Sequence, residues 1–169
     1  MKSKIVLLLV VISFSTLSFA QTNKGNWIVS GNSSLQVSSS KLEGAGSSTT
    51  TVVFNPSLGY FVTDGLAVGA SVNLLSSDGT TVYAILPAVS YYFQTQSQVK
   101  PFVEVGIGYG GISADSDSSG GLVLGADAGI VYLINQNIGI NLGMQYLRGD
   151  YDGFVNNTFG GVLGFSIFI

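Results

Sequence analysis

The feature that most constrains the fold is an alternation of apolar and small polar residues with a period of two, which recurs along the chain after Asn26. In segment 51–62, one parity carries Val52, Phe54, Pro56, Leu58, Tyr60 and Val62, and the other carries Thr51, Val53, Asn55, Ser57, Gly59 and Phe61. Side chains of a β-strand point alternately to its two faces, so this period predicts strands with one apolar face. The pattern predicts eight such strands, within 26–37, 51–62, 66–75, 81–93, 102–111, 121–134, 138–148 and 158–169.

The polarity of the two faces indicates which surroundings each one meets. Only 9% of the residues are charged, whereas soluble domains carry about 25%. The face rich in Gly, Ser and Asn cannot lie in hydrocarbon, and a soluble barrel would show the reverse pattern, with apolar residues inside and charges outside. Strands cross lipid only when every backbone polar group is paired, which requires closure. We therefore expect an all-β fold, an eight-stranded antiparallel up-and-down transmembrane β-barrel with a narrow lumen.

The first twenty residues have the layout of a secretory signal peptide. Lys2 and Lys4 provide a positively charged start, and Ile5 to Ile12 form an apolar run too short to cross a membrane as a helix. Ser18, Phe19 and Ala20 follow as a cleavage site with small residues at the two positions that a signal peptidase recognises. We expect residues 1–20 to be removed and residues 21–169 to form the barrel domain.

The connections between the expected strands alternate between tight and longer ones, as in outer-membrane barrels. Tight turns are expected at 63–65 and 135–137, with a somewhat longer connection at 94–99. Loops rich in Ser, Gly and Asp are expected at 38–48, 76–80, 112–120 and 149–153, of which the first is the longest and the second and fourth are short for external loops. With the N-terminus in the periplasm, an even number of strands returns the C-terminus there and leaves these loops at the cell surface.

Aromatic residues are expected at the two headgroup levels of the membrane, because amphipathic rings favour these interfaces. The alternation places eight rings on the apolar face near strand ends. They form a periplasmic girdle of Trp27, Tyr60, Tyr91, Phe93 and Tyr132, and an external girdle of Tyr83, Tyr109 and Tyr146.

Charge and residue usage exclude several classes of function. Without Lys2 and Lys4, the six basic residues fall to four against nine acidic ones, a formal net charge of −5. This balance disfavours a nucleic-acid partner. The chain has no Cys and no His, so disulfides, thiolate metal sites and mechanisms with a His base are excluded. We expect no enzymatic activity, no cofactor and no metal site.

Glu104 and Asp127 are the two acidic residues that the alternation places in the lumen. They are symmetric about the expected 114–119 loop, so the hairpin between their strands can bring them opposite each other. Paired carboxylates occur in active sites, but we favour a hydrogen-bonding network in the lumen with neighbours such as Gln145, Asn141 and Ser71, or with water. Like-charge repulsion would favour a proton on one carboxylate.

Two further motifs resemble ligand-binding loops incompletely. The stretch DSDSSG at 115–120 copies the opening of a calcium loop, but Ala126 stands where the bidentate Glu is needed, which favours an acidic solvated loop. GIGYGG at 106–111 lacks the helix that follows a phosphate-binding loop. Its alternate glycines are better explained by close packing in a narrow lumen.

The cleaved signal, the eight alternating segments and the terminal strand resemble the small outer-membrane β-barrel domain family that includes OmpX and the OmpA transmembrane domain. The resemblance covers 26–169 and is carried by phrases such as LPAVSYYF at 86–93 and PFVEVGIGYG at 101–110. It implies that the last strand is a signal for the barrel assembly machinery, through Gly164, Ile167 and Ile169. Val162 and the terminal Ile169 depart from the family pattern, in which a polar residue and a terminal Phe are usual.

These observations predict an integral protein of the Gram-negative outer membrane, exported by the signal peptide, with a largely filled lumen and a structural or surface-interaction role in the cell envelope. Its expected partners are outer-membrane lipid and, during biogenesis, the secretion and barrel assembly machinery; the surface ligand is unknown. A small-solute porin-like channel is the alternative, supported by the lumen glycines but disfavoured by the narrow interior of eight strands. A soluble lipid-binding barrel is a third possibility.

Overall fold

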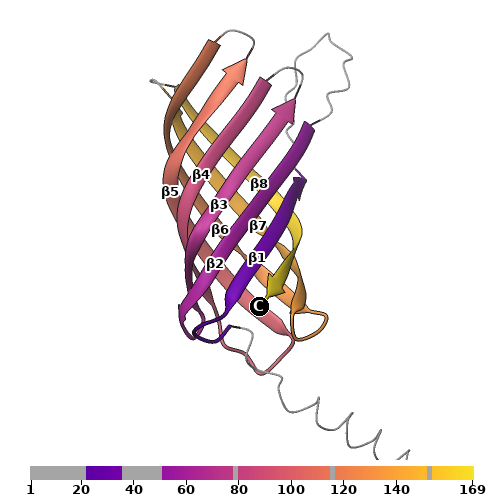
Figure 1. Ribbon diagram of the computed structural model, residues 1–169. Helices are drawn as coiled ribbons and strands as arrows, with labels where there is room; N and C mark the ends of the chain where they lie inside the picture. Colours follow the sequence, from indigo (N-terminus) through magenta and orange to yellow (C-terminus); the bar gives the residue numbers. More distant parts are fainter. Residues whose placement is uncertain (1–21, 36–50, 78–79, 115–116, 152–153) are drawn as a thin grey trace, which may run out of the picture.

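The computed structural model describes residues 22–35, 51–77, 80–114, 117–151 and 154–169 as a closed barrel of eight strands (Figure 1). The strands are β1 (Trp27–Leu35), β2 (Thr51–Thr63), β3 (Leu66–Ser77), β4 (Thr80–Tyr92), β5 (Val99–Ala114), β6 (Asp117–Leu133), β7 (Ile138–Tyr151) and β8 (Phe154–Phe168). Each strand pairs antiparallel with the next, and β8 pairs with β1. Within these residues, no helix is long and apolar enough to cross a membrane. The predicted fold class is confirmed.

The seam between β8 and β1 closes the sheet. Its register runs from Ile28 opposite Phe168 to Leu35 opposite Gly161. Beyond β8, Ile169 continues the ladder, because its backbone N–H and C=O both bond to Trp27, at 2.9 and 2.8 Å. The strand edge that an open sheet would expose is therefore paired.

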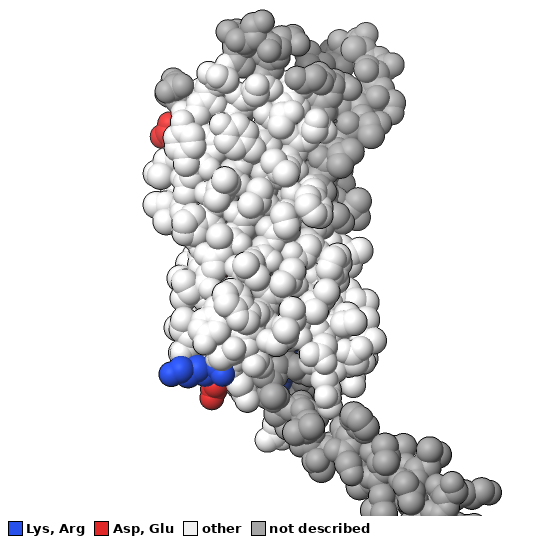
Figure 2. Space-filling model, viewed as in Figure 1, with Lys and Arg blue, Asp and Glu red and all other residues white. Residues whose placement is uncertain are grey.

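The alternation assigns the two faces of the wall correctly. Residues of one parity, such as Leu58, Val105 and Phe165, have about half or more of their surface exposed on the outside. Residues of the other parity, such as Asn55 and Phe61, are buried inside. On the face of the molecule seen in Figure 2, charged atoms lie only near the two ends, so the wall between them is uncharged.

The two ends of the barrel differ in their connections. We call the end with the start of β1 and the end of β8 the terminal end, and the opposite one the loop end. At the terminal end, two, six and four residues separate β2 from β3, β4 from β5, and β6 from β7. At the loop end, two residues each separate β3 from β4, β5 from β6, and β7 from β8.

The connection expected at 112–120 is therefore much shorter than predicted, and the short loops expected at 76–80 and 149–153 are shorter still. Strand pairing extends through most of these residues, and the β5–β6 ladder ends only at Ala114 opposite Asp117. Ser, Gly and Asp are typical of turns, but the ladder uses backbone groups that every non-proline residue carries. Residues 1–20 and the expected loop 38–48 lie outside the described residues, as do 115–116 and 152–153.

The turn between β2 and β3 is hydrogen-bonded to the segment that precedes β1, at Thr22. Gly65 has a φ of +78°, and a Cβ there would lie 2.6 Å from the backbone oxygen of Tyr92, so only glycine fits without strain. Its N–H donates to the backbone oxygen of Thr22, and its C=O accepts from the N–H of Tyr92. Thr22 is buried and shares a hydrogen bond with the side chain of Gln94. This segment packs against the terminal end.

Candidate functional site in the barrel lumen

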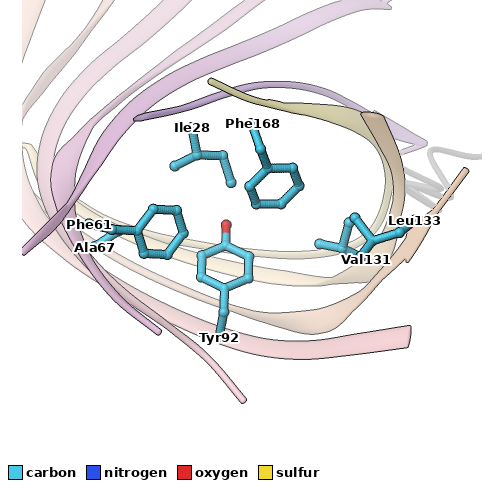
Figure 3. Close-up of a cluster of buried hydrophobic side chains, with 7 residues drawn as sticks. All are labelled: Ile28, Phe61, Ala67, Tyr92, Val131, Leu133 and Phe168. Atoms are coloured by element: carbon cyan, nitrogen blue, oxygen red, sulfur yellow. The ribbon is translucent and has the colours of Figure 1, made fainter. Parts of the chain in front are cut away.

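An apolar plug fills the lumen near the terminal end (Figure 3). It consists of the buried side chains Ile28, Phe61, Ala67, Tyr92, Val131, Leu133 and Phe168, with Phe102 packed against them. Among the described residues, every strand except β7 contributes a side chain to it. Figure 3 shows that these side chains converge from opposite sides of the wall.

Aromatic contacts within the plug span the full width of the barrel. Tyr92 on β4 and Phe168 on β8 lie four strands apart around the closed sheet, yet their ring centroids are 6.3 Å apart in an edge-to-face arrangement. Phe61 lies 5.6 Å from Tyr92 and 6.4 Å from Phe168. Rings at these distances pack against each other, so opposite walls of the barrel touch through their side chains at this level.

Lys100 is buried at the terminal end, directly opposite the plug residue Val131 in the strand register. It is only 5% exposed, and its Nζ donates a 2.5 Å hydrogen bond to the backbone oxygen of Thr95. Lys100 directly follows the connection expected at 94–99, and only the structure shows that it is buried. Its alkyl stem packs inside while the ammonium group reaches the backbone of the connection.

A polar layer lies on the loop-end side of the plug. Its residues are Ser30, Asn32, Asn55, Ser57, Ser71, Asn73, Ser90, Glu104, Asp127, Asn141, Gln145 and Ser166. Ser30 and Ser166 hydroxyls lie 2.7 Å apart, Ser166 donates to Asn141 at 2.9 Å, and Asn141 donates to Asn32 at 3.1 Å. This chain of hydrogen bonds joins β1, β8 and β7 across their inner faces.

Gln145 connects β7 to β2 and β3 within the polar layer. Its Oε1 accepts from Asn55 at 3.4 Å, and its Nε2 donates to Asn73 at 3.5 Å. These bonds run from β7 to β2 and β3, which face β7 across the lumen. The layer is therefore crosslinked by side chains through the middle of the barrel.

The predicted carboxylate pair lies at the centre of this layer. Glu104 on β5 is directly opposite Asp127 on β6 in the strand register, as the hairpin symmetry predicts. Ser90 flanks Glu104 in the register of β4, and Gln145 flanks Asp127 in the register of β7. Each carboxylate is hydrogen-bonded to its flanking side chain. The expected contact with Gln145 is present, and Ser71 and Asn141 line the same small cavity.

The lumen contains cavities on the loop-end side of the plug. A small one, of about 30 Å³, is lined by residues of the polar layer, with Tyr92 and Phe102 at its border. A larger one, of about 170 Å³, lies toward the loop end and is lined by residues that include Ala84, Val123 and Tyr151. Both are lined by Asn55, Asn73 and Gln145, so the larger cavity reaches the polar layer.

The predicted aromatic girdles lie on the outer face at the expected ends of their strands. Seven of the eight rings are exposed: Trp27, Tyr83, Tyr91, Phe93, Tyr109, Tyr132 and Tyr146. Tyr60 is half-buried because it packs against Trp27 at 5.0 Å between ring centroids. Tyr91 and Phe93 form a similar pair at 5.1 Å. Whether these rings anchor the barrel in a membrane stays a prediction.

The three residues of the predicted assembly signal lie in or just after β8. Gly164 faces inward, and a Cβ there would lie within 2.4 Å of the backbone oxygen of Gly31. Ile167 and Ile169 face outward, with Ile167 paired to Val29 in register. Their positions show how they take part in the seam, and their recognition by assembly machinery stays a prediction.

The two incomplete motifs lie mainly in strands. Gly106 to Gly111 belong to β5, and Gly106, Gly108 and Gly110 face inward as expected. Residues 117–120 of the calcium-like stretch pair with β5, and the preceding Asp115 and Ser116 lie outside the described residues. The described part of this stretch is therefore a strand, which replaces the expected acidic loop.

The plug was not predicted from the sequence. The alternation places Phe61 on the inner face, but the other residues of that face are small and mostly polar. Tyr92 and Phe168 also have inward parity and stand, like Phe61, at the terminal end of their strands. Large inward residues at one end of several strands were the signal that could have revealed it.

Known proteins share the sequence pattern and the fold of this chain. The sequence profile of the outer membrane protein β-barrel domain matches residues 6–166, and no curated protein matches the sequence significantly. The fold resembles the N-terminal β-barrel domain of Pseudomonas aeruginosa OprF, with a TM-score of 0.62, 15% identity, and coverage of 86% of this chain and 98% of that one. Neisserial surface protein A has a TM-score of 0.60 and 18% identity, with coverage of 86% of this chain and 97% of that one. Ail, the attachment invasion locus protein of Yersinia pestis, has a TM-score of 0.53 and 17% identity, with coverage of 86% of this chain and 99% of that one. The chain belongs to the family of outer membrane protein β-barrel domains.

Proposed function

We propose that the protein is a non-enzymatic outer-membrane barrel with a closed lumen, which anchors rigid hairpins at the cell surface for envelope integrity or surface interaction. The terminal end faces the periplasm, and residues 1–20 direct export before cleavage. Outer-membrane lipid surrounds the wall, and the secretion and barrel assembly machinery act during biogenesis. Family membership supports the location, whereas the role rests on the lumen and the hairpins.

The main observation that supports a closed lumen is the contact between Tyr92 and Phe168 across the barrel, with ring centroids 6.3 Å apart. The remaining plug side chains fill the space around these rings. An open aqueous channel needs a continuous polar path, and eight-stranded barrels have interiors that side chains can fill. The plug supports a closed barrel over the small-solute channel that remains the alternative.

The hairpins at the loop end support a surface role. About 9 to 11 tilted residues are enough to cross a bilayer, whereas β5, β6 and β7 contain 16, 17 and 14 residues. The excess length extends the ladder beyond the lipid as paired strands. Two of the similar structures are named for a surface protein and an attachment locus, and their low identity leaves the surface role as our proposal.

Electrical recordings of the refolded barrel in planar bilayers test the closed lumen. We expect no stable conductance from the wild-type protein. The double variant F61A/Y92A should open transient or stable pores, because it removes the two largest rings next to Phe168. The variant Y91A is the matched control, because Tyr91 neighbours Tyr92 in β4 but is exposed on the outer face.

Stable wild-type openings with the conductance of an open aqueous pore would overturn the proposal in favour of a channel. Equal behaviour of Y91A and F61A/Y92A would show that the rings of the plug are not the barrier. Heat-dependent mobility on gels, which distinguishes folded barrels from unfolded chains, would confirm that each variant inserts before its recording is interpreted.

A further inference from the structure

We propose that the polar layer binds one hard metal cation of the calcium type, held by oxygen atoms of Glu104, Asp127 and Asn55. The proposal goes beyond the closed-lumen role and departs from the sequence-based expectation of no metal site. It concerns a ligand held inside the barrel, and it holds whether or not the lumen conducts.

The first observation is an excess of negative charge inside the barrel. Glu104 and Asp127 lie opposite each other, with Cβ atoms of such pairs typically about 5 Å apart. The described residues that line the small cavity include no Lys or Arg. Lys100, on the same strand as Glu104, lies toward the terminal end and donates to Thr95. Two carboxylates in a confined space without a basic partner favour a bound cation or a proton.

The second observation is independent of the acidic pair. Asn55 is 95% buried, and its Oδ1 has no hydrogen-bond partner, although its Nδ2 donates to Gln145. The Oδ1 atom of Asp127 is also buried without a partner. Buried acceptors without a donor are costly, so each such atom in a folded protein requires an explanation. Both residues line the small cavity together with Glu104.

The cavity has the size and chemistry of a single-ion site. Its volume of about 30 Å³ exceeds the roughly 10–15 Å³ that a water-sized occupant needs. The available ligands are carboxylate, amide and hydroxyl oxygens, which suit hard cations. Among the described residues, no group of three Asp, Glu, His or Cys side chains gathers. The site therefore combines two carboxylates with neutral oxygens.

The ligand set favours Ca²⁺ over Mg²⁺. Ca²⁺ accepts irregular geometries with carboxylate and amide oxygens, whereas Mg²⁺ requires a near-ideal octahedron and usually keeps several waters. A space of about one or two water molecules leaves little room for such a hydration shell. The larger cavity, which shares Asn55, Asn73 and Gln145 with the small one, offers the ion a path from the loop end.

Native mass spectrometry of the mature protein, refolded in detergent with Ca²⁺, tests the proposal. We expect one retained Ca²⁺ per wild-type barrel and a higher urea midpoint in Ca²⁺ than in Mg²⁺. The variant E104Q/D127N should fold and lose both effects. The variant D64N/D150N removes the same charge from exposed positions at the two ends of the barrel and should keep both.

Three results would overturn the proposal. Retention of Ca²⁺ by E104Q/D127N at wild-type stoichiometry would place the ion elsewhere. Absence of Ca²⁺ from the folded wild-type protein would mean that the layer holds only water or protons. Equal retention of Mg²⁺ would remove the assignment to a calcium-type ion.

A gain-of-function variant tests the role of Asn55 separately. Calcium affinity rises with the number of charged ligands, so N55D should lower the Kd for Ca²⁺ by about tenfold in competition with a calcium indicator. The same change at the exposed Asn157, in N157D, is the matched control. An unchanged Kd in N55D would remove Asn55 from the site.

Discussion

The plug and the polar layer are neighbouring levels of one lumen, and they are built on opposite principles. The plug is apolar apart from the hydroxyl group of Tyr92, and it depends on contacts between rings from distant strands (Figure 3). The polar layer contains two carboxylates and a network of amides and hydroxyls, with two acceptors left unpaired. An apolar level resists the passage of ions, whereas a polar level can hold one. The same barrel therefore combines a barrier with a candidate binding site.

The largest expected effect is a loss of stability on truncation of a ring in the plug, compared with truncation of a ring on the outer wall. The variant F61A should lower the free energy of unfolding by about 3 kcal/mol, because it removes a fully buried ring and leaves a cavity. Phe61 is 0% exposed, whereas Phe159 on the outer face is 69% exposed, so F159A should cost far less in detergent. Urea unfolding followed by the fluorescence of Trp27, the single tryptophan, measures both. Equal losses in the two variants would show that the plug adds no stability of its own.

A smaller effect is expected from the hydrogen-bond chain of the polar layer. The variant S166A should cost about 1 to 2 kcal/mol, because it leaves the Oδ1 atom of Asn141 without its donor. The exposed Ser118 on β6 provides the control variant S118A, which should change the free energy of unfolding by less than about 0.5 kcal/mol. The same urea titration applies. If S166A were as stable as S118A, the network would be dispensable for folding.

The smallest effect has the opposite sign. In buffer with a chelator, E104Q should raise the free energy of unfolding by about 0.5 kcal/mol, because it removes like-charge repulsion between opposite residues. The new amide can also donate to the unpaired Oδ1 atom of Asp127. The control D150N changes an exposed acidic residue and should have no measurable effect. A loss of stability in E104Q without cations would contradict the account of Glu104 as an unneutralised lumen charge.

Much of the fold could be predicted because a strand encodes its two faces directly. The period of two identified the strands, and the absence of charge on the apolar face predicted a membrane-type wall. The opposition of Glu104 and Asp127 also followed from sequence, because a hairpin pairs residues symmetric about its turn. The strand ends were predicted less well, since Ser113 and Ser118 pair in the ladder despite their turn-like surroundings.

Three features depended on the tertiary structure. Tyr92 and Phe168 have inward parity, but only the tilt and closure of the sheet bring these rings, from opposite strands, to the same height. The hydrogen bonds of Gln145 to Asn55 and Asn73 cross the barrel between strands that are not neighbours. The inward direction of Lys100 at the terminal end also required the observed start of β5.

The sequence by itself determined the number of strands, the two faces of the wall and the pairing of Glu104 with Asp127 across their hairpin, because these depend on local periodicity and on the turn between consecutive strands. Only the tertiary structure decided the level at which inward side chains meet, and with it the separation of the plug from the polar layer. The physical reason is that closure sets a stagger between distant strands, and this stagger follows from the sum of all eight registers rather than from any one segment.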